Sequence, residues 1–230
     1  MSTDGNALYR LMSWLSPSFP VGAFSYSHGI EYAVEAGLVR DEETLRAWIA
    51  AGLHHEFGSI AGAMLRATYE AAAARDRALL GEALAEARAF VPTAEFELEN
   101  RAQGQAFMLC LRAAWSDAQD LAWMDRVLNE DWVPYPSAVG IAAALASVPL
   151  ETTLGAFFHA VVSNLVSAGI RLIPLGQTAG QRILAQLQSA VLSAASDVLK
   201  RDASDVGSAA PLIEWTSVRH ETQYTRLFRS

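Results

Sequence analysis

Apolar residues recur at intervals of three and four along most of this 230-residue chain, and that spacing is the period of an amphipathic helix. The first such stripe is Leu8, Leu11, Met12 and Leu15. No stretch combines two-residue alternation with a hairpin turn, which is the pattern that would indicate a sheet. The sequence therefore predicts an all-α fold, a single-domain bundle of about ten helices followed by a C-terminal tail.

Capping residues and helix breakers give the expected boundaries. Asp41 and Thr93 are typical N-cap residues at the start of apolar stripes. Gly58 and Ser59 are expected to break the helix that Asp41 starts, and Gly37 is expected to end the helix before it. The other helices are expected at about 8–15, 27–36, 59–74, 76–90, 116–128, 137–147, 151–169 and 177–199.

The composition changes after residue 200. Asp202 to Ala210 consists of small and acidic residues, which is typical of a flexible linker. The segment from Pro211 onward carries aromatic and arginine side chains, the usual anchors of protein interfaces. We therefore predict an all-helical domain over 1–200 and, over 201–230, a flexible linker with a partner-binding C-terminal tail. The alternative is a strap that packs on its own bundle.

Charge and composition exclude several classes of protein. The chain has 17 Lys and Arg against 25 Asp and Glu, a net charge of −8 that argues against a nucleic-acid binder. Only 18% of the residues are charged and 52% are hydrophobic, which excludes a disordered chain and suggests a surface covered by another protein. The only lysine is Lys200, so no Gly-Lys-Ser/Thr phosphate-binding loop exists.

The expected location is the cytoplasm. The single cysteine, Cys110, fits a reducing compartment. The first residues lack the basic and apolar regions of an export signal. Leu154 to Ile170 is the most apolar segment, but polar residues interrupt it and a membrane span needs about 20 apolar residues. We expect it to be a buried helix, with no membrane contact.

Neither a metal site nor a catalytic centre is evident. The five histidines include no His-x-x-x-His pair, and the adjacent His54 and His55 would point in different directions on a helix. His159 lies in an apolar helix and is expected to be a core residue. Ser25 and Ser27 precede His28, but the Gly-x-Ser-x-Gly turn of serine hydrolases is absent. We therefore expect no intrinsic cofactor, no tight metal site and no enzymatic activity.

Three segments are not explained by bundle packing alone. Pro17 to Glu31 combines glycines and prolines with the run Phe-Ser-Tyr-Ser-His. Arg171 to Arg182 has Gly176 and Gly180 four residues apart at a helix start, which suits either a tight helix crossing or an anion at the helix N-terminus. The third segment is the arginine-rich end of the chain.

These segments carry a resemblance to a known family. Leu11 to Glu31 resembles the opening signature of the urease accessory protein F family, Arg171 to Gln181 resembles its second signature, and His220 to Ser230 resembles its usual last residues. Two departures are Ala23 for a common glycine and Ile30 for a common leucine.

The resemblance implies an all-α, non-catalytic, dimeric protein that works in nickel insertion into apo-urease. It implies binding to accessory protein D, called H in some organisms, and recruitment of the GTPase, accessory protein G. Nickel-carrying accessory protein E is a further implied partner. On this basis nickel and GTP are handled by the partners, and this chain is a scaffold that holds them in register.

The partner-binding residues are expected in the three segments. The arginines of the third segment would pair with carboxylates of a partner, and deleting residues 220–230 is predicted to abolish assembly. An arginine supplied in trans to the GTPase is a further hypothesis. The candidates are Gly22, Ser25, Tyr26, His28, Arg171, Gln177, Gln181, Arg219, His220, Glu221, Tyr224, Arg226, Phe228 and Arg229.

Two alternatives of other classes stay open at this point. The first is an all-α enzyme with a pocket near Ser25, Tyr26 and His28. The second is a direct nickel carrier that uses His28, His54, His55 or His220, and equilibrium dialysis would separate such a carrier from a scaffold.

Overall fold

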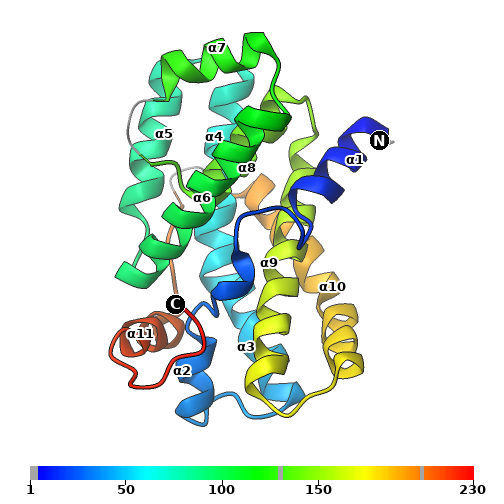
Figure 1. Ribbon diagram of the computed structural model, residues 1–230, viewed down its shortest axis with the longest axis vertical. Helices are drawn as coiled ribbons and strands as arrows, with labels where there is room; N and C mark the ends of the chain where they lie inside the picture. Colours follow the sequence, from blue (N-terminus) through cyan, green and yellow to red (C-terminus); the bar gives the residue numbers. More distant parts are fainter. Residues whose placement is uncertain (1–4, 129–131, 203–204) are drawn as a thin grey trace.

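The computed structural model describes residues 5–128, 132–202 and 205–230, and within them it contains eleven α-helices, one short 3-10 helix and no strand (Figure 1). The predicted all-α class is therefore confirmed. The elements are α1 (Gly5–Trp14), η1 (Ala23–Ser25), α2 (Ile30–Glu35), α3 (Glu42–His55), α4 (Phe57–Ala73), α5 (Arg77–Ala89), α6 (Ala94–Ala114), α7 (Ala118–Val127), α8 (Tyr135–Leu145), α9 (Leu150–Leu172), α10 (Gln177–Lys200) and α11 (Pro211–His220).

The centre of the bundle is made by α4, α8 and α9. The helix α8 is buried along most of its length and packs against α4. A Cβ atom on Gly140 would lie 2.4 Å from the carbonyl oxygen of Leu65, so these two helices cross in direct backbone contact. By length and composition, α9 is the one helix of the described segments that could cross a membrane, but half of its most apolar window is buried inside the protein. It packs against α8 and α10, as the core helix of a bundle does.

The predicted N-caps at Asp41 and Thr93 are confirmed. The Asp41 carboxylate accepts the amide of Thr44 at 2.8 Å, and the Thr93 hydroxyl accepts the amide of Phe96 at 3.2 Å. The predicted break at Gly58 and Ser59 is wrong, because α3 ends at His55 and α4 already begins at Phe57. The predicted helix over 27–36 starts later, at Ile30, because both residues before it, His28 and Gly29, have positive φ angles.

A helix that the sequence pattern did not predict occupies residues 211–220. Its apolar residues form no stripe along one face, and its buried residues face α2 and α6, which are distant in sequence. Residues 203 and 204 of the predicted linker lie outside the described residues. The division of the chain at residue 200 stays a prediction.

The helices α2 and α11 lie side by side (Figure 1). Their contact depends on Gly29, which has a φ of 78° and immediately precedes α2. A Cβ atom at this position would lie 2.8 Å from the Thr216 hydroxyl and 3.1 Å from the Ser217 amide nitrogen. The first sequence motif, Pro17 to Glu31, therefore contacts α11 directly, and α11 leads into the motif at the end of the chain.

Replacing Gly29 with alanine should therefore destabilise the protein by about 2–4 kcal/mol, because the new methyl group adds overpacking to an unfavourable φ angle. The matched control is Gly37→Ala, since Gly37 also has a positive φ of 71° but has open space around its Cα. Urea unfolding of both variants checks this, and equal losses of stability would show that α11 does not press on Gly29.

Candidate functional site

The segment after α11 runs back along the bundle and joins the first sequence motif. We call residues 221–230 the strap. The Arg229 amide donates to the carbonyl oxygen of Ser25 at 2.8 Å, and both the amide and the hydroxyl of Ser27 donate to the carbonyl oxygen of Ser230, at 2.6 and 2.8 Å. Two of the three motifs, far apart in sequence, therefore form one structure.

Glu31 holds the middle of the strap. Its side chain is buried, with only 6% of the residue exposed. One carboxylate oxygen accepts the amide of Leu227 at 2.6 Å, and the other accepts the amide of Phe228 at 2.9 Å. The second oxygen also lies 3.0 Å from Nε2 of His220. A single buried carboxylate thus fixes both the strap and the end of α11.

His220 bridges α2 and α6 through two carboxylates. Its ring is fully buried, with Nε2 on Glu31 and Nδ1 at 2.8 Å from the carboxylate of Glu95. Burial alone would lower the pKa of His220, but the hydrogen bonds to Glu95 and Glu31 raise it above its ordinary value. Arg226 of the strap adds a second cation, 3.3 Å from Glu95. This charge cluster of two carboxylates and two cations is balanced.

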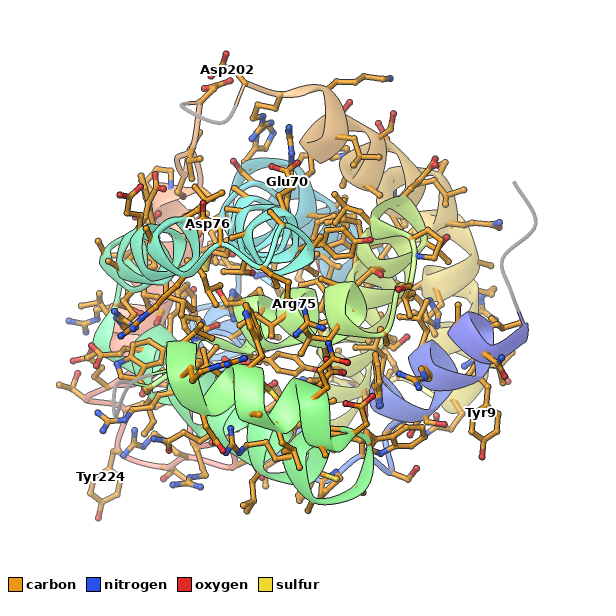
Figure 2. All side chains as sticks on the ribbon, turned by 90° about the horizontal axis from the view of Figure 1, so that it is seen from above. Tyr9, Glu70, Arg75, Asp76, Asp202 and Tyr224 are labelled. Atoms are coloured by element: carbon orange, nitrogen blue, oxygen red, sulfur yellow. The ribbon has the colours of Figure 1, made fainter. Side chains whose placement is uncertain are left out.

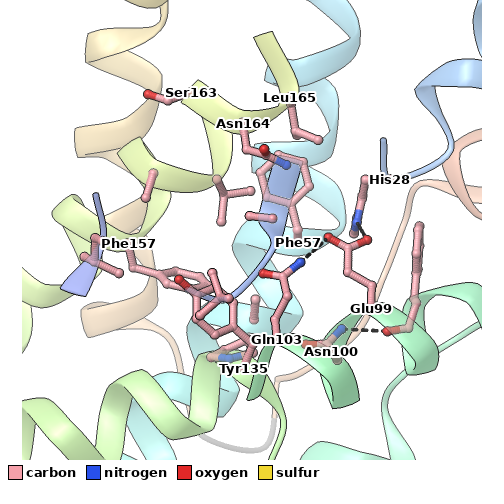
Figure 3. A pocket seen from close by; sticks show the side chains of 18 of the residues that line it. His28, Phe57, Glu99, Asn100, Gln103, Tyr135, Phe157, Ser163, Asn164 and Leu165 are labelled. Carbon is pink, nitrogen blue, oxygen red and sulfur yellow. Dashed lines mark hydrogen bonds and ion pairs between the residues drawn. The ribbon is translucent and has the colours of Figure 1, made fainter. Parts of the chain in front are cut away.

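A second buried cluster lies around His28, at the start of α2. Its Nε2 is 3.0 Å from the carboxylate of Glu56. Its Nδ1 is 3.4 Å from the carboxylate of Glu99 (Figure 3). The ring stacks on Phe96 at 3.9 Å between centroids. Burial acts to lower the pKa of His28, but the charge of Glu56 and the hydrogen bonds with both carboxylates raise it to about 10. The Ser230 hydroxyl donates to Glu99 at 3.1 Å, so the strap also reaches this cluster.

These two histidines predict a loss of stability at alkaline pH. Because each pKa is raised in the folded protein, the native state binds more protons than the unfolded chain above about pH 6.5. For His28 the free energy of unfolding should fall as pH rises from about 6.5 toward about 10, by up to about 1.4 kcal/mol per pH unit. The raised pKa of His220 adds to the fall above about pH 6.5. Urea unfolding at a series of pH values measures this slope. His28→Gln should flatten it, whereas the exposed control His54→Gln should not; identical slopes would contradict the assignment.

The second motif reaches the strap through one residue. The Arg171 guanidinium lies over the ring of Phe228, 4.4 Å from its centroid. Gly180 packs at close range against Val166, in agreement with a tight helix crossing at the start of α10. Gln177 and Gln181 are exposed on α10, and their side chains make no hydrogen bond to the described residues. The structure therefore brings Arg171 to the strap and leaves the two glutamines apart from it.

The remaining tail candidates divide into buried anchors and exposed groups. Phe228 is buried, whereas Glu221 is exposed. The Arg219 guanidinium lies over the ring of Tyr32 and donates to its hydroxyl at 3.2 Å, and that of Arg229 lies over Tyr26, 5.9 Å from the ring centroid. The predicted partner-binding arginines thus also make contacts within the chain.

Large apolar side chains remain exposed along α11 and the strap. Tyr224 is fully exposed, at 103% of its reference area, and points away from the helices (Figure 2). We call the following set the strap surface: Leu212, Trp215, Val218, Tyr224 and Leu227. The buried carboxylate of Glu31 holds the chain close to these side chains, at His220 and at the amides of Leu227 and Phe228.

The contacts of the histidines and serines bear on the expected absence of a metal site and of a catalytic nucleophile. Among the described residues no group of three or more His, Cys, Asp or Glu side chains is arranged to hold a metal ion. Both ring nitrogens of His28 face carboxylates, and the hydroxyl of Ser27 donates to Ser230, so His28 does not activate that serine.

Gly22, with a φ of 72°, begins the turn before Ser25. His159, expected in the core, is exposed on α9 and lies 3.4 Å from the Ser163 hydroxyl.

The sequence did not identify the carboxylates of the site, Glu56, Glu95 and Glu99. Glu95 and Glu99 look like acidic residues that stabilise the N-terminal end of a helix, and Glu56 belongs to no recognisable motif. The one available signal was Glu31, which closes the first motif. The carboxylates that contact the two histidines are between 28 and 189 residues away from them in sequence.

Comparisons with known proteins give a consistent result. The UreF family model matches residues 39–188. The urease accessory protein UreF of Rhodopseudomonas palustris (strain BisB5) is 51% identical over 224 residues, which cover 97% of this chain and 91% of the relative. The protein of the same name from Bradyrhizobium diazoefficiens is 50% identical, with coverages of 99% and 93%. That of Granulibacter bethesdensis is 46% identical, with coverages of 100% and 96%.

Proposed function

Because this chain belongs to the UreF family of urease accessory proteins, we propose that it is a non-catalytic scaffold for GTP-dependent insertion of nickel into apo-urease. It binds accessory protein D, called H in some organisms, together with the GTPase, accessory protein G, and presents them to apo-urease. Accessory protein E supplies nickel to this assembly. The scaffold acts in the cytoplasm as a homodimer.

The observation that supports this proposal most is the strap. Glu31 and His220 fix its backbone from inside the protein, while its outer side carries the exposed Tyr224 and Leu227. A rigid backbone lowers the entropy that docking costs, and exposed aromatic residues supply the contact area. Burying charged groups to present an apolar surface has no evident benefit for an isolated chain, but it suits a docking site.

In this proposal the partner proteins, and not this chain, bind GTP and nickel. It has no lysine for a phosphate-binding loop, and nickel prefers histidine nitrogen or thiolate ligands. The ring nitrogens of His28 and His220 are already engaged by carboxylates. In the proposal the GTPase therefore binds the nucleotide, and nickel passes between partners that the scaffold holds together.

Urease maturation itself tests the function. Urease is purified from cells that carry its structural and accessory genes, with and without the gene for this chain, and its nickel content and activity are measured. The proposal predicts urease with little nickel in the absence of this chain, and recovery when the gene is restored. Full nickel content without it would contradict the proposal.

A further inference from the structure

A partly open cavity of about 340 Å³ lies beside the His28 cluster, between the loop before α2 and the helices α4, α6, α8 and α9 (Figure 3). Its volume is within the range of small-molecule sites, about 300–1,000 Å³. Apolar side chains form most of the wall, among them Ile60, Met64 and Phe157. Polar groups converge on it from His28, Glu56, Glu99, Gln103 and Tyr135.

The polar part of this cavity places two carboxylates, Glu56 and Glu99, against one imidazole, His28. His28 is the only cation that the described residues bring within ion-pair distance of Glu56 and Glu99. Glu56 is only 3% exposed, and of its two carboxylate oxygens only Oε2 has a hydrogen-bond partner in the described part of the chain. The neighbouring cluster of Glu31 and Glu95 has two cations for two carboxylates. Two carboxylates that share one histidine, in a cavity with mostly apolar walls, are suited to a positively charged ligand.

Two further groups in the cavity have unused hydrogen-bonding capacity. Gln103 is buried and donates its amide to Glu99 at 2.9 Å, but nothing in the described residues donates to its amide oxygen. The Tyr135 hydroxyl makes no hydrogen bond to the described residues, and burial raises the pKa of this phenol far above its ordinary value. Neither the Gln103 amide oxygen nor the Tyr135 hydroxyl is among the fully buried polar atoms of the described residues that lack a partner, so both can meet a ligand that enters the cavity.

We propose that the cavity binds a small organic monocation, with an ammonium or amidinium group against Glu56 and Glu99 and an apolar body against Ile60, Met64 and Phe157. The N–H groups of such a head can donate to the free oxygen atoms of Glu56 and Gln103. Of the two histidines that line the cavity, His28 and His159, only His28 lies against the carboxylates, and both of its ring nitrogens already face them. The inference stands apart from the proposed function, because it concerns the interior of the bundle and not the strap surface.

Titration of the full chain with benzylammonium and with its neutral isostere, benzyl alcohol, tests the proposal. Calorimetry gives the affinities, and methyl NMR signals of Ile60 and Met64 locate the ligand. We expect benzylammonium to bind at one site per chain, at least about tenfold tighter than the alcohol, because only the cation makes charge-assisted hydrogen bonds. Equal affinities, or binding without a shift of these methyl signals, would overturn the proposal.

Matched variants on α6 separate the site from general electrostatics. Glu99→Gln should weaken benzylammonium binding about tenfold or more, whereas Glu97→Gln, at an exposed position of the same helix, should leave it unchanged. Equal weakening by both would overturn the assignment. Nickel chloride provides a last comparison in the unmodified protein, and displacement of benzylammonium by one equivalent of nickel would identify the cavity as a metal site instead.

Discussion

Replacing Glu31 with alanine should release the strap from the bundle. The change removes the acceptor of the Leu227 and Phe228 amides and leaves His220 with one carboxylate instead of two. Breaking a buried ion pair by removing one partner costs about 3–5 kcal/mol. Hydrogen exchange at these two amides should therefore accelerate by at least about 100-fold. Without their acceptor, the amides become exposed to water whenever the strap opens locally, and this opening requires less free energy than in the parent protein.

The control for this change lies on the same helix. Glu35→Ala alters an exposed residue of α2 and should leave exchange at Leu227 and Phe228 unchanged. Helical circular dichroism of both variants should match that of the parent protein, because α4, α8 and α9 form the core without the strap. Undiminished protection in the Glu31 variant would show that the strap is held by other contacts.

The combined variant Tyr224→Ala and Leu227→Ala should weaken partner binding without loosening the strap. Both side chains are exposed, and the Leu227 amide that Glu31 accepts remains in place. Exposed aromatic anchors that become buried at an interface often contribute about 2 kcal/mol or more. Titration with purified accessory protein D should therefore show an affinity at least about 30-fold lower.

A surface variant is more informative here than removal of the strap. Deleting residues 220–230 also removes His220 and leaves Glu31 and Glu95 buried without a cation, so any loss of assembly could come from misfolding. Leu109→Ala provides the control, because Leu109 is also exposed but lies on α6 outside the strap surface. If the control and the double variant lose the same affinity, the strap surface is not the docking site.

Local patterns predicted the bundle well because helices are specified by nearby residues. The period of three and four residues located ten of the eleven helices, and Asp41 and Thr93 act as N-caps through hydrogen bonds that span three residues. The break between α3 and α4 was placed wrongly because glycine normally interrupts a helix, whereas Gly58 here lies in the first turn of α4. The helix α11 was missed because its stability comes from α2 and α6 and not from its own periodicity.

The site was predictable only in part, for a physical reason. Resemblance of the three motifs identified Ser25, His28 and His220 as important, but periodicity and spacing carry no information on which carboxylates face them. Glu56, at the junction of α3 and α4, and Glu95, on α6, contact histidines that are distant in sequence. Burial of these charges became evident only once the helices were packed together.

The central claim is that this chain supplies a docking surface while its partners carry the nucleotide and the metal. Co-expression with accessory proteins D and G, followed by size-exclusion chromatography with mass measurement, tests it most directly. We expect all three chains in one assembly, which the double variant of Tyr224 and Leu227 fails to form. Separate elution of the unmodified chain from both partners would contradict the claim.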